Sequence, residues 1–251
     1  MKLGFSPLTA GLDYRACFDL AAELGLFLEV AYDQHEIDYR LPGAKELREM
    51  GRVSGVGFTL HLPFIDWNIA SLVPSQFELS LHRTQEAVDF GAEIGAAVGV
   101  LHTGLIAIRL PEAVMYAQER LDAALEKLEL GIPVALENLG LNGHDLLETP
   151  AELADLLSRH SRFGFCQDVA HALLQRGAAG NIDYHALLAH RRTHWHLCDT
   201  PGTWDAHLPC GEGVVDWGWV RSALVGFEGT AALEVTGGLE GVRKSVELLR
   251  A

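Results

Sequence analysis

Short apolar runs alternate with longer amphipathic segments along the chain, and the two kinds of segment have different periods. The short runs, bounded by Gly or polar residues, are typical of strands. The longer segments repeat apolar residues every three or four positions, which predicts helices that bury one face. The predicted strands are residues 2–6, 26–30, 56–62, 98–102, 133–138, 163–168, 193–198 and 230–235. The predicted helices are residues 13–24, 43–53, 74–94, 111–131, a segment that opens at Pro150, 183–190, 216–225 and 238–249.

Strand and helix alternate eight times over 251 residues. This order and length are those of a single-domain (β/α)8 TIM barrel, an α/β fold, and we expect one domain over residues 1–251. An open doubly wound sheet is the structural alternative, and it would place ligands at one switch point rather than at many strand ends. Gly25 and Gly95 each follow a predicted helix and Gly131 closes another, and glycine fits the left-handed position that ends a helix.

Polar residues in the predicted strands fall in phase near the strand ends. Because successive side chains of a strand point to opposite faces, Trp195 and Leu197 oppose His194 and His196. Six consecutive strands carry a histidine or an acid at the last inward position: His61, His102, Glu137, Asp168, His196 and Glu234. We expect these side chains at the carboxyl-terminal mouth of the barrel, where barrel enzymes place their chemistry.

Four of these residues make a donor set for a metal ion. Glu137, Asp168, His196 and Glu234 offer three carboxylates and one imidazole. Such a set suits Mn²⁺, Zn²⁺, Co²⁺, Mg²⁺ or Fe²⁺, whereas the thiolate-rich type of site is excluded because no Cys stands at these positions. We therefore expect a divalent metal ion at the mouth.

Further donors lie close to this set in the predicted barrel: His61, His102, His171, Asp205 and His207. His171, Asp205 and His207 are placed to hold a second cation or to grip a polar substrate, and His61 and His102 form a third pair. One bound ion is the expectation, and the donors suffice for up to three. A single histidine at a strand end is more often a hydrogen-bonded structural residue than a ligand. The prediction of a metal site therefore depends on six adjacent strands that each carry a histidine or an acid in phase.

Other residues divide between functional and structural interpretations. The histidines in loops and helices are interpreted as structural: His35, His82, His144, His160, His185 and His190. The loop Asp33-Gln34-His35-Glu36 is expected at the barrel mouth, within reach of a substrate. Phe64, Trp67 and Trp204 form either apolar walls of the mouth or part of the core. Asp199 and Asp205 are also suited to capping turns.

Charge narrows the class of partner, because the chain holds 34 acidic against 19 basic residues and its pI is near 5.1. Broad binding to nucleic acid depends on Lys and Arg, so such a partner is disfavoured. Four cysteines without a C-x-x-C motif fit a reducing cytoplasm better than a disulfide scaffold. No signal peptide and no run of about 18 apolar residues is found, so we expect a cytoplasmic protein without a membrane partner. The helix surfaces are compatible with a homo-oligomer.

Several motifs resemble the xylose isomerase-like TIM barrel superfamily, and the resemblance covers nearly the whole chain. They are HLP (61–63), LHTG (101–104), ALEN (135–138), QDVAHA (167–172), HLCD (196–199), DAHLPCGEG (205–213) and LEV (233–235). The superfamily contains sugar-phosphate isomerases and epimerases and the endonuclease IV type of AP endonuclease. The order of three motifs is fairly specific for the superfamily: D-x-x-H, then H-L-x-D, then D-x-H-L-P-x-G-x-G. This order does not identify one activity within it.

In isomerase and epimerase members, the resemblance implies a metal held by Glu137, Asp168, His196 and Glu234. The two glutamates would also act as acid and base on opposite faces of the substrate, and His171 would contact it. In endonuclease IV members nine residues hold three zinc ions, and each of the nine has a counterpart here: His61, His102, Glu137, Asp168, His171, His196, Asp205, His207 and Glu234.

The loops favour the sugar enzymes over the repair enzymes. Endonuclease IV has Gly- and basic-rich loops that enter DNA, whereas this chain has ENLGLNGHDLLETPAEL after the fifth strand and a short, almost uncharged TGLIAIRLPEA after the fourth. The sequence therefore predicts a metal-dependent isomerase or epimerase that acts on a small sugar, polyol or sugar phosphate through an enediolate. A zinc-dependent AP endonuclease is the alternative, a metal-dependent dehydratase or lyase is a third interpretation, and a non-catalytic barrel is disfavoured because the donor set is intact.

Overall fold

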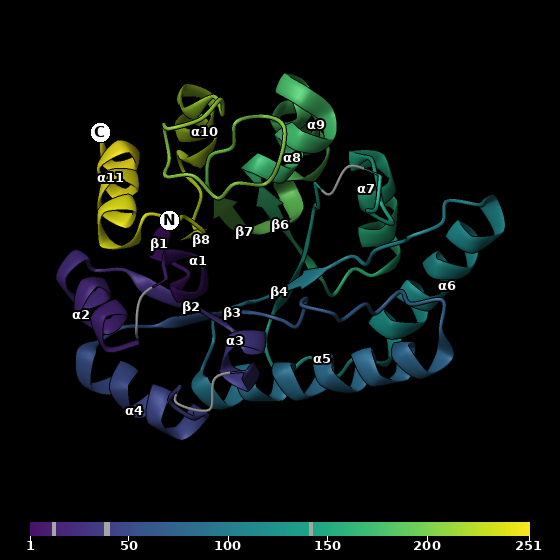
Figure 1. Ribbon diagram of the computed structural model, residues 1–251, viewed down its shortest axis with the longest axis horizontal. Coiled ribbons are helices and arrows are strands. Elements are labelled where there is room, and N and C mark those ends of the chain that lie inside the picture. Colours follow the sequence, from purple (N-terminus) through teal and green to yellow (C-terminus); the bar gives the residue numbers. More distant parts are fainter. Residues whose placement is uncertain (12–13, 38–40, 141–142) are drawn as a thin grey trace.

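Eight parallel strands close into a barrel in the order of the chain, β1 to β8, with β8 pairing back onto β1 (Figure 1). This computed structural model describes residues 1–11, 14–37, 41–140 and 143–251. The strands are β1 (Lys2–Phe5), β2 (Phe27–Ala31), β3 (Phe58–His61), β4 (Gly99–His102), β5 (Val134–Glu137), β6 (Gly164–Asp168), β7 (Arg192–Leu197) and β8 (Thr230–Leu233). The predicted (β/α)8 barrel is confirmed, and the open sheet is excluded because the ladder has no edge.

Helices cover the outside of the barrel (Figure 1). They are α1 (Pro7–Ala10), α2 (Tyr14–Leu24), α3 (Tyr32–Ile37), α4 (Ala44–Ser54), α5 (Pro74–Ile94), α6 (Pro111–Lys127), α7 (Pro150–Arg159), α8 (Val169–Arg176), α9 (Gly180–Leu188), α10 (Trp217–Leu224) and α11 (Gly238–Arg250), with 3-10 turns at Gly177–Ala179 and Ala189–Arg191. Every predicted helix is present. The short α1, α3 and α8 are additions, because helices of one or two turns give too little sequence for a period to be read.

Two of the three predicted glycine helix ends are confirmed. Gly25 and Gly95 follow α2 and α5 with φ of 66° and 73°, the left-handed conformation that glycine adopts without a Cβ clash. The third was wrong, because α6 ends at Lys127 and the chain continues in extended conformation at Leu128, with ψ of 130°. Gly131 is thus part of the connection to β5 and not the end of the helix.

The barrel has a large outer core and a small inner one. Outward strand residues such as Leu60, Phe165 and Trp195 pack with the helices in the large apolar cluster. Inside the barrel, Val98, Val100, Ala135 and Cys166 form a separate cluster. The rest of the interior includes fully buried polar side chains, so the barrel is filled by a hydrogen-bonded layer as well as by apolar packing.

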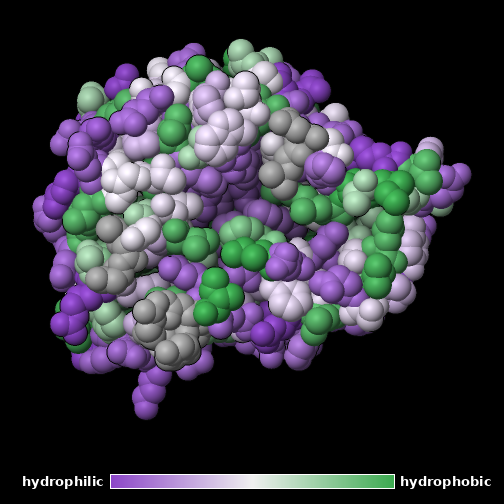
Figure 2. Space-filling model, viewed as in Figure 1, coloured by the Kyte–Doolittle hydropathy of each residue, from purple (hydrophilic) through white to green (hydrophobic). Residues whose placement is uncertain are grey.

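Register brings the polar strand ends to one level. His102 is paired with Glu137 across β4 and β5, and Asp168 with His196 across β6 and β7. Figure 2 shows that one face of the molecule is hollowed near its centre and that the exposed floor of the hollow is hydrophilic. Among the described residues, no helix is both long enough and apolar enough to span a bilayer.

Candidate metal centre

The four residues predicted as metal ligands converge at the carboxyl ends of the last four strands. Glu137 and Asp168 end β5 and β6, His196 is the next-to-last residue of β7, and Glu234 follows β8 directly. Each of the four offers one ligand atom, and these atoms all lie within 4.8 Å of one another. Three of the side chains are fully buried and Glu234 is 7% exposed. The geometry suits a divalent cation bound by three carboxylates and one imidazole.

Burying three carboxylates together is costly unless a cation compensates them. Asp168 is the carboxylate that is least compensated, since its Oδ2 is buried and accepts no hydrogen bond from any described residue. Burial raises the pKa of Asp168 to about 6, against the opposing pull of His171, and Glu137 adds to the increase. A metal ion between these oxygens would supply the missing partner, so the residues present fit the ion that the sequence predicts.

His61 and His102 lie on the β3–β4 side of Glu137, as a pair. Their rings are 4.9 Å apart, and their Nε2 atoms lie 3.7 and 3.2 Å from Glu137 Oε2. The ring of His61 is fixed because its Nδ1 is 2.8 Å from the carbonyl of Leu62, which leaves Nε2 to face the glutamate. Burial lowers the pKa of His102, which therefore favours the neutral, metal-binding form.

His171 and His207 share one carboxylate on the other side of the centre. Asp205 Oδ2 lies 3.3 Å from His171 Nε2 and 3.0 Å from His207 Nε2. Each imidazole is held through Nδ1 by a backbone carbonyl, of Asn138 for His171 and of Glu234 for His207. His207 has φ of 48°, in the left-handed region that a non-glycine residue rarely occupies, and such strain is found at functional positions. The second predicted group is therefore assembled, and it adjoins the first.

Asn138 and Asp168 tie these groups together. The Asn138 amide donates to the carbonyl of Asp168 at 3.0 Å and accepts from the backbone N–H of Asp168 at 2.9 Å. Asp168 Oδ1 in turn accepts the N–H of His171 at 2.6 Å and so caps α8. Its other oxygen is left for the centre. The role of Asn138 was missed from the sequence, although it directly follows Glu137.

The loop that carries Asp205 and His207 is organised by Asp199, which is fully buried. Its Oδ1 accepts the N–H groups of Thr200 and Val215, and its Oδ2 accepts those of Gly211 and the Trp217 indole, at 2.7 to 3.0 Å. Of the two interpretations, the turn-capping one holds for Asp199. It shapes the wall of the site and contributes no oxygen to the centre.

Glu29 is a buried acid that the sequence analysis did not select. It lies in the middle of β2 with no exposed surface and contacts His194 and His196 of β7, with Nε2–oxygen distances of 3.0 Å for each. Thr59 donates to the same carboxylate at 2.7 Å. A charged residue inside the apolar run 26–30 was the available signal, because such a residue in a strand either faces solvent or has a buried partner.

The remaining predictions have mixed outcomes. The expected loop from Asp33 is helix α3; Asp33 accepts the N–H groups of Phe64 and Ile65, so it shapes the turn after β3, while the side chain of His35 lies outside the described residues. Phe64 is an aromatic wall at the site, with its ring 4.5 Å from that of His61. Trp204 is 62% exposed, which excludes the core role.

Comparison with known proteins agrees with the barrel fold. Residues 18–251 match the family model described as xylose isomerase-like TIM barrel. Among solved structures, a D-tagatose 3-epimerase-like protein superposes with a TM-score of 0.84 over 100% of this chain and 96% of its own, at 23% identity. The TTHB071 protein from Thermus thermophilus, soaked with ZnCl2, superposes with a TM-score of 0.77 over 100% and 97%, at 27% identity.

Curated relatives include an uncharacterized protein and repair enzymes. The uncharacterized protein, MJ1311 of Methanocaldococcus jannaschii, is 28% identical over 82% of this chain and 73% of its own length. The probable endonuclease 4 of Mycobacterium leprae is 28% identical over 53% of each chain. Because the family model matches nearly all of the sequence, this chain belongs to the xylose isomerase-like TIM barrel family.

Proposed function

We propose that the protein is a metal-dependent isomerase or epimerase that acts on a small, uncharged sugar or polyol-type carbonyl compound. The observation that carries the proposal is the position of Glu137 and Glu234 within one candidate ligand set, on strands separated by β6 and β7. Two carboxylates that reach a shared substrate from different sides are what proton removal and proton return require.

The residues divide the chemistry between them. The cation, when bound, supplies Lewis-acid polarisation of a carbonyl and stabilises negative charge on the neighbouring oxygen. Glu137 is ionised and so able to accept a proton, because His196, His102 and His171 together hold its pKa well below the ordinary value in spite of burial; its role as base depends on position, since a lowered pKa weakens it as a base. Glu234 returns a proton. Return to the same carbon from the other face gives epimerisation, and return to the adjacent carbon gives isomerisation.

The rim of the mouth favours an uncharged substrate. The segments that follow β3, β4, β5, β7 and β8 hold one Lys or Arg among them, Arg109. Its guanidinium is bound to the Asp145 carbonyl at 2.6 Å and to Glu148 at 2.8 Å, so a substrate phosphate would compete with these partners. With a formal net charge of −15, the protein offers a polyanion little attraction.

A zinc-dependent AP endonuclease is the second candidate, because one specific observation favours it. The donors form three adjacent groups, around Glu137 with His61 and His102, around Asp168 and His196, and around Asp205 with His171 and His207. Three groups of this kind could hold three ions. Shared identity with endonuclease 4 proteins also supports it, over about half of either chain.

The experiment that tests the proposal starts with elemental analysis of protein purified without added metal. The preferred function predicts one ion per chain and, on a panel of ketoses in D2O, deuterium exchange at the carbon beside the carbonyl, seen by NMR. Glu137→Gln and Glu234→Gln should abolish that exchange while the protein stays folded. Three zinc ions per chain, cleavage of an abasic DNA duplex and no ketose exchange would replace the proposal with the second candidate.

A further inference from the structure

The interior of the barrel beneath the candidate centre contains a buried polar layer that the proposed reaction does not use. Glu29 of β2 holds the middle of this layer, with Thr59 of β3 on one oxygen and the two histidines of β7 around it. His194 is fixed at its other ring nitrogen, since Nδ1 lies 2.6 Å from the hydroxyl of Thr230. All of these side chains are less than a tenth exposed.

His196 is the residue that joins this layer to the metal centre, because its two ring nitrogens face different partners. Nδ1 faces the mouth, at 2.9 Å from Glu137 Oε1 and 3.4 Å from Glu234 Oε2. Nε2 faces the interior, at 3.0 Å from Glu29 Oε1. An imidazole can present a lone pair at only one nitrogen when the other carries a proton, so the partner of Nε2 decides what Nδ1 can offer.

We infer that Glu29 is a positioning residue: its carboxylate holds the proton of His196 at Nε2 and thereby directs the Nδ1 lone pair toward the metal set of Glu137, Asp168 and Glu234. Histidines that bind metal commonly donate their other N–H to a carboxylate, which fixes the ring and makes it a better ligand. The inference rests on the proposed metal site. It extends that site by a residue from β2, a strand that supplies none of the predicted ligands.

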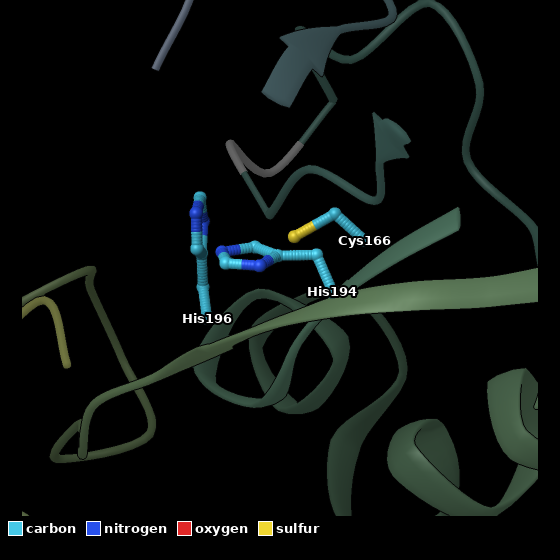
Figure 3. Close-up of side chains that lie close together, drawn as sticks. All are labelled: Cys166, His194 and His196. Carbon is cyan, nitrogen blue, oxygen red and sulfur yellow. The ribbon is translucent and has the colours of Figure 1, made fainter. Parts of the chain in front are cut away.

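A metal ion is an alternative occupant of the same space. Cys166, His194 and His196 lie close together, with the two imidazole rings nearly perpendicular at 88° (Figure 3). These atoms are close enough to be ligands of a second, deeper ion. Contacts within the layer account for these side chains without an ion: Glu29 oxygens lie 3.0 Å from both Nε2 atoms, and the Thr230 hydroxyl lies 2.6 Å from His194 Nδ1.

Two measurements test the inference. In the Zn²⁺-loaded wild type, long-range ¹H–¹⁵N spectra should show His196 protonated at Nε2, with slow exchange of that proton because it is buried against Glu29. In calorimetric titration with Zn²⁺, Glu29→Gln should bind roughly 10- to 100-fold more weakly than wild type, the range typical for loss of such a partner. The matched control is Thr230→Val, which removes a polar contact in the same layer without touching His196 and should change the affinity less than about threefold.

The outcomes separate this inference from the proposed function. Zn²⁺ binding by the wild type, together with an unchanged affinity in a folded Glu29→Gln protein, would overturn the inference alone. So would a His196 Nε2 without a proton, or a second bound equivalent whose Co²⁺ form shows a thiolate charge-transfer band from Cys166. If Glu29→Gln does not fold, the spectrum of the wild type decides the matter. A wild type that binds no divalent ion at all would overturn the proposed function, and this inference with it.

Discussion

Asp199→Asn is the substitution whose effect can be worked out most directly from the structure. The carboxylate accepts four hydrogen bonds, two on each oxygen, from donors spread over residues 200–217. An asparagine keeps one oxygen and turns an amide NH2 toward the other two donors, so two N–H groups in a fully buried site lose their acceptor. Each such loss costs about 1–3 kcal/mol, which gives about 2–6 kcal/mol for the pair.

Urea denaturation of the metal-free protein measures this loss. With a slope near 3 kcal/mol/M for a chain of this size, the midpoint should fall by at least about 0.7 M. The matched control is Asp216→Asn. Asp216 caps α10 by accepting the N–H of Trp219 on an exposed surface, and asparagine caps a helix about as well as aspartate. A midpoint for Asp199→Asn as close to wild type as that of Asp216→Asn would refute the reasoning that this carboxylate holds the loop.

Three further results are expected. Glu137→Gln and Glu234→Gln should each lower kcat by at least about 10²-fold in protein that still folds, measured by steady-state kinetics and circular dichroism; full activity in both would remove them from the acid–base role. Metal-free protein should lose stability as pH rises. Burial raises the pKa of Asp168 in the folded state to about 6, and Asp205 raises the pKa of His207 to about 9 in spite of burial. Both groups therefore bind their protons more tightly in the folded than in the unfolded protein. Since the proposed cation needs Asp168 deprotonated, the rise in melting temperature on adding Zn²⁺ should grow as the pH rises through about 6 in differential scanning fluorimetry, and a constant rise would contradict this. Gly213→Ala should destabilise by roughly 1–3 kcal/mol, because a Cβ there would overlap Asp199 Oδ1 and the Thr200 carbonyl; Gly57→Ala, where a Cβ meets open space and φ is likewise outside the left-handed region, is the comparison and should change stability less.

Sequence periodicity predicted the barrel and the level of the site for a physical reason. In a parallel strand the side-chain direction is fixed by the period of two, so an acid or histidine at a strand end must point either into the mouth or into a helix. Burying the carboxylate of Glu137 or Asp168 against a helix without a partner would cost too much free energy, so these side chains point into the mouth. The prediction that a helix ends at Gly131 was wrong because a glycine permits the left-handed conformation without requiring it.

Contacts between distant strands could not be predicted in this way. Glu29 can be recognised in the sequence as a charged residue in an apolar run, yet its histidine partners are in β7 and the local pattern does not identify them. The same holds for Asn138, whose amide is bonded to the backbone of Asp168 in the next strand. Such residues support the ligands from behind, and their identity depends on register, which only the closed barrel defines.

The choice between the two candidate reactions depends on the rim and not on the ligands, because either reaction can use the nine residues assembled here. A phosphodiester in DNA brings its charge to the mouth before any metal is reached, and the electrostatic attraction that would draw it there comes from Lys and Arg. The one basic residue in the segments after β3, β4, β5, β7 and β8, Arg109, is bound to Asp145 and Glu148. A neutral sugar has no such requirement, since hydroxyl groups are recognised by short-range hydrogen bonds. His171, Asp205 and His207 supply donors and acceptors of that kind within reach of Glu137 and Glu234. The described rim therefore favours the proposed small, neutral substrate over DNA.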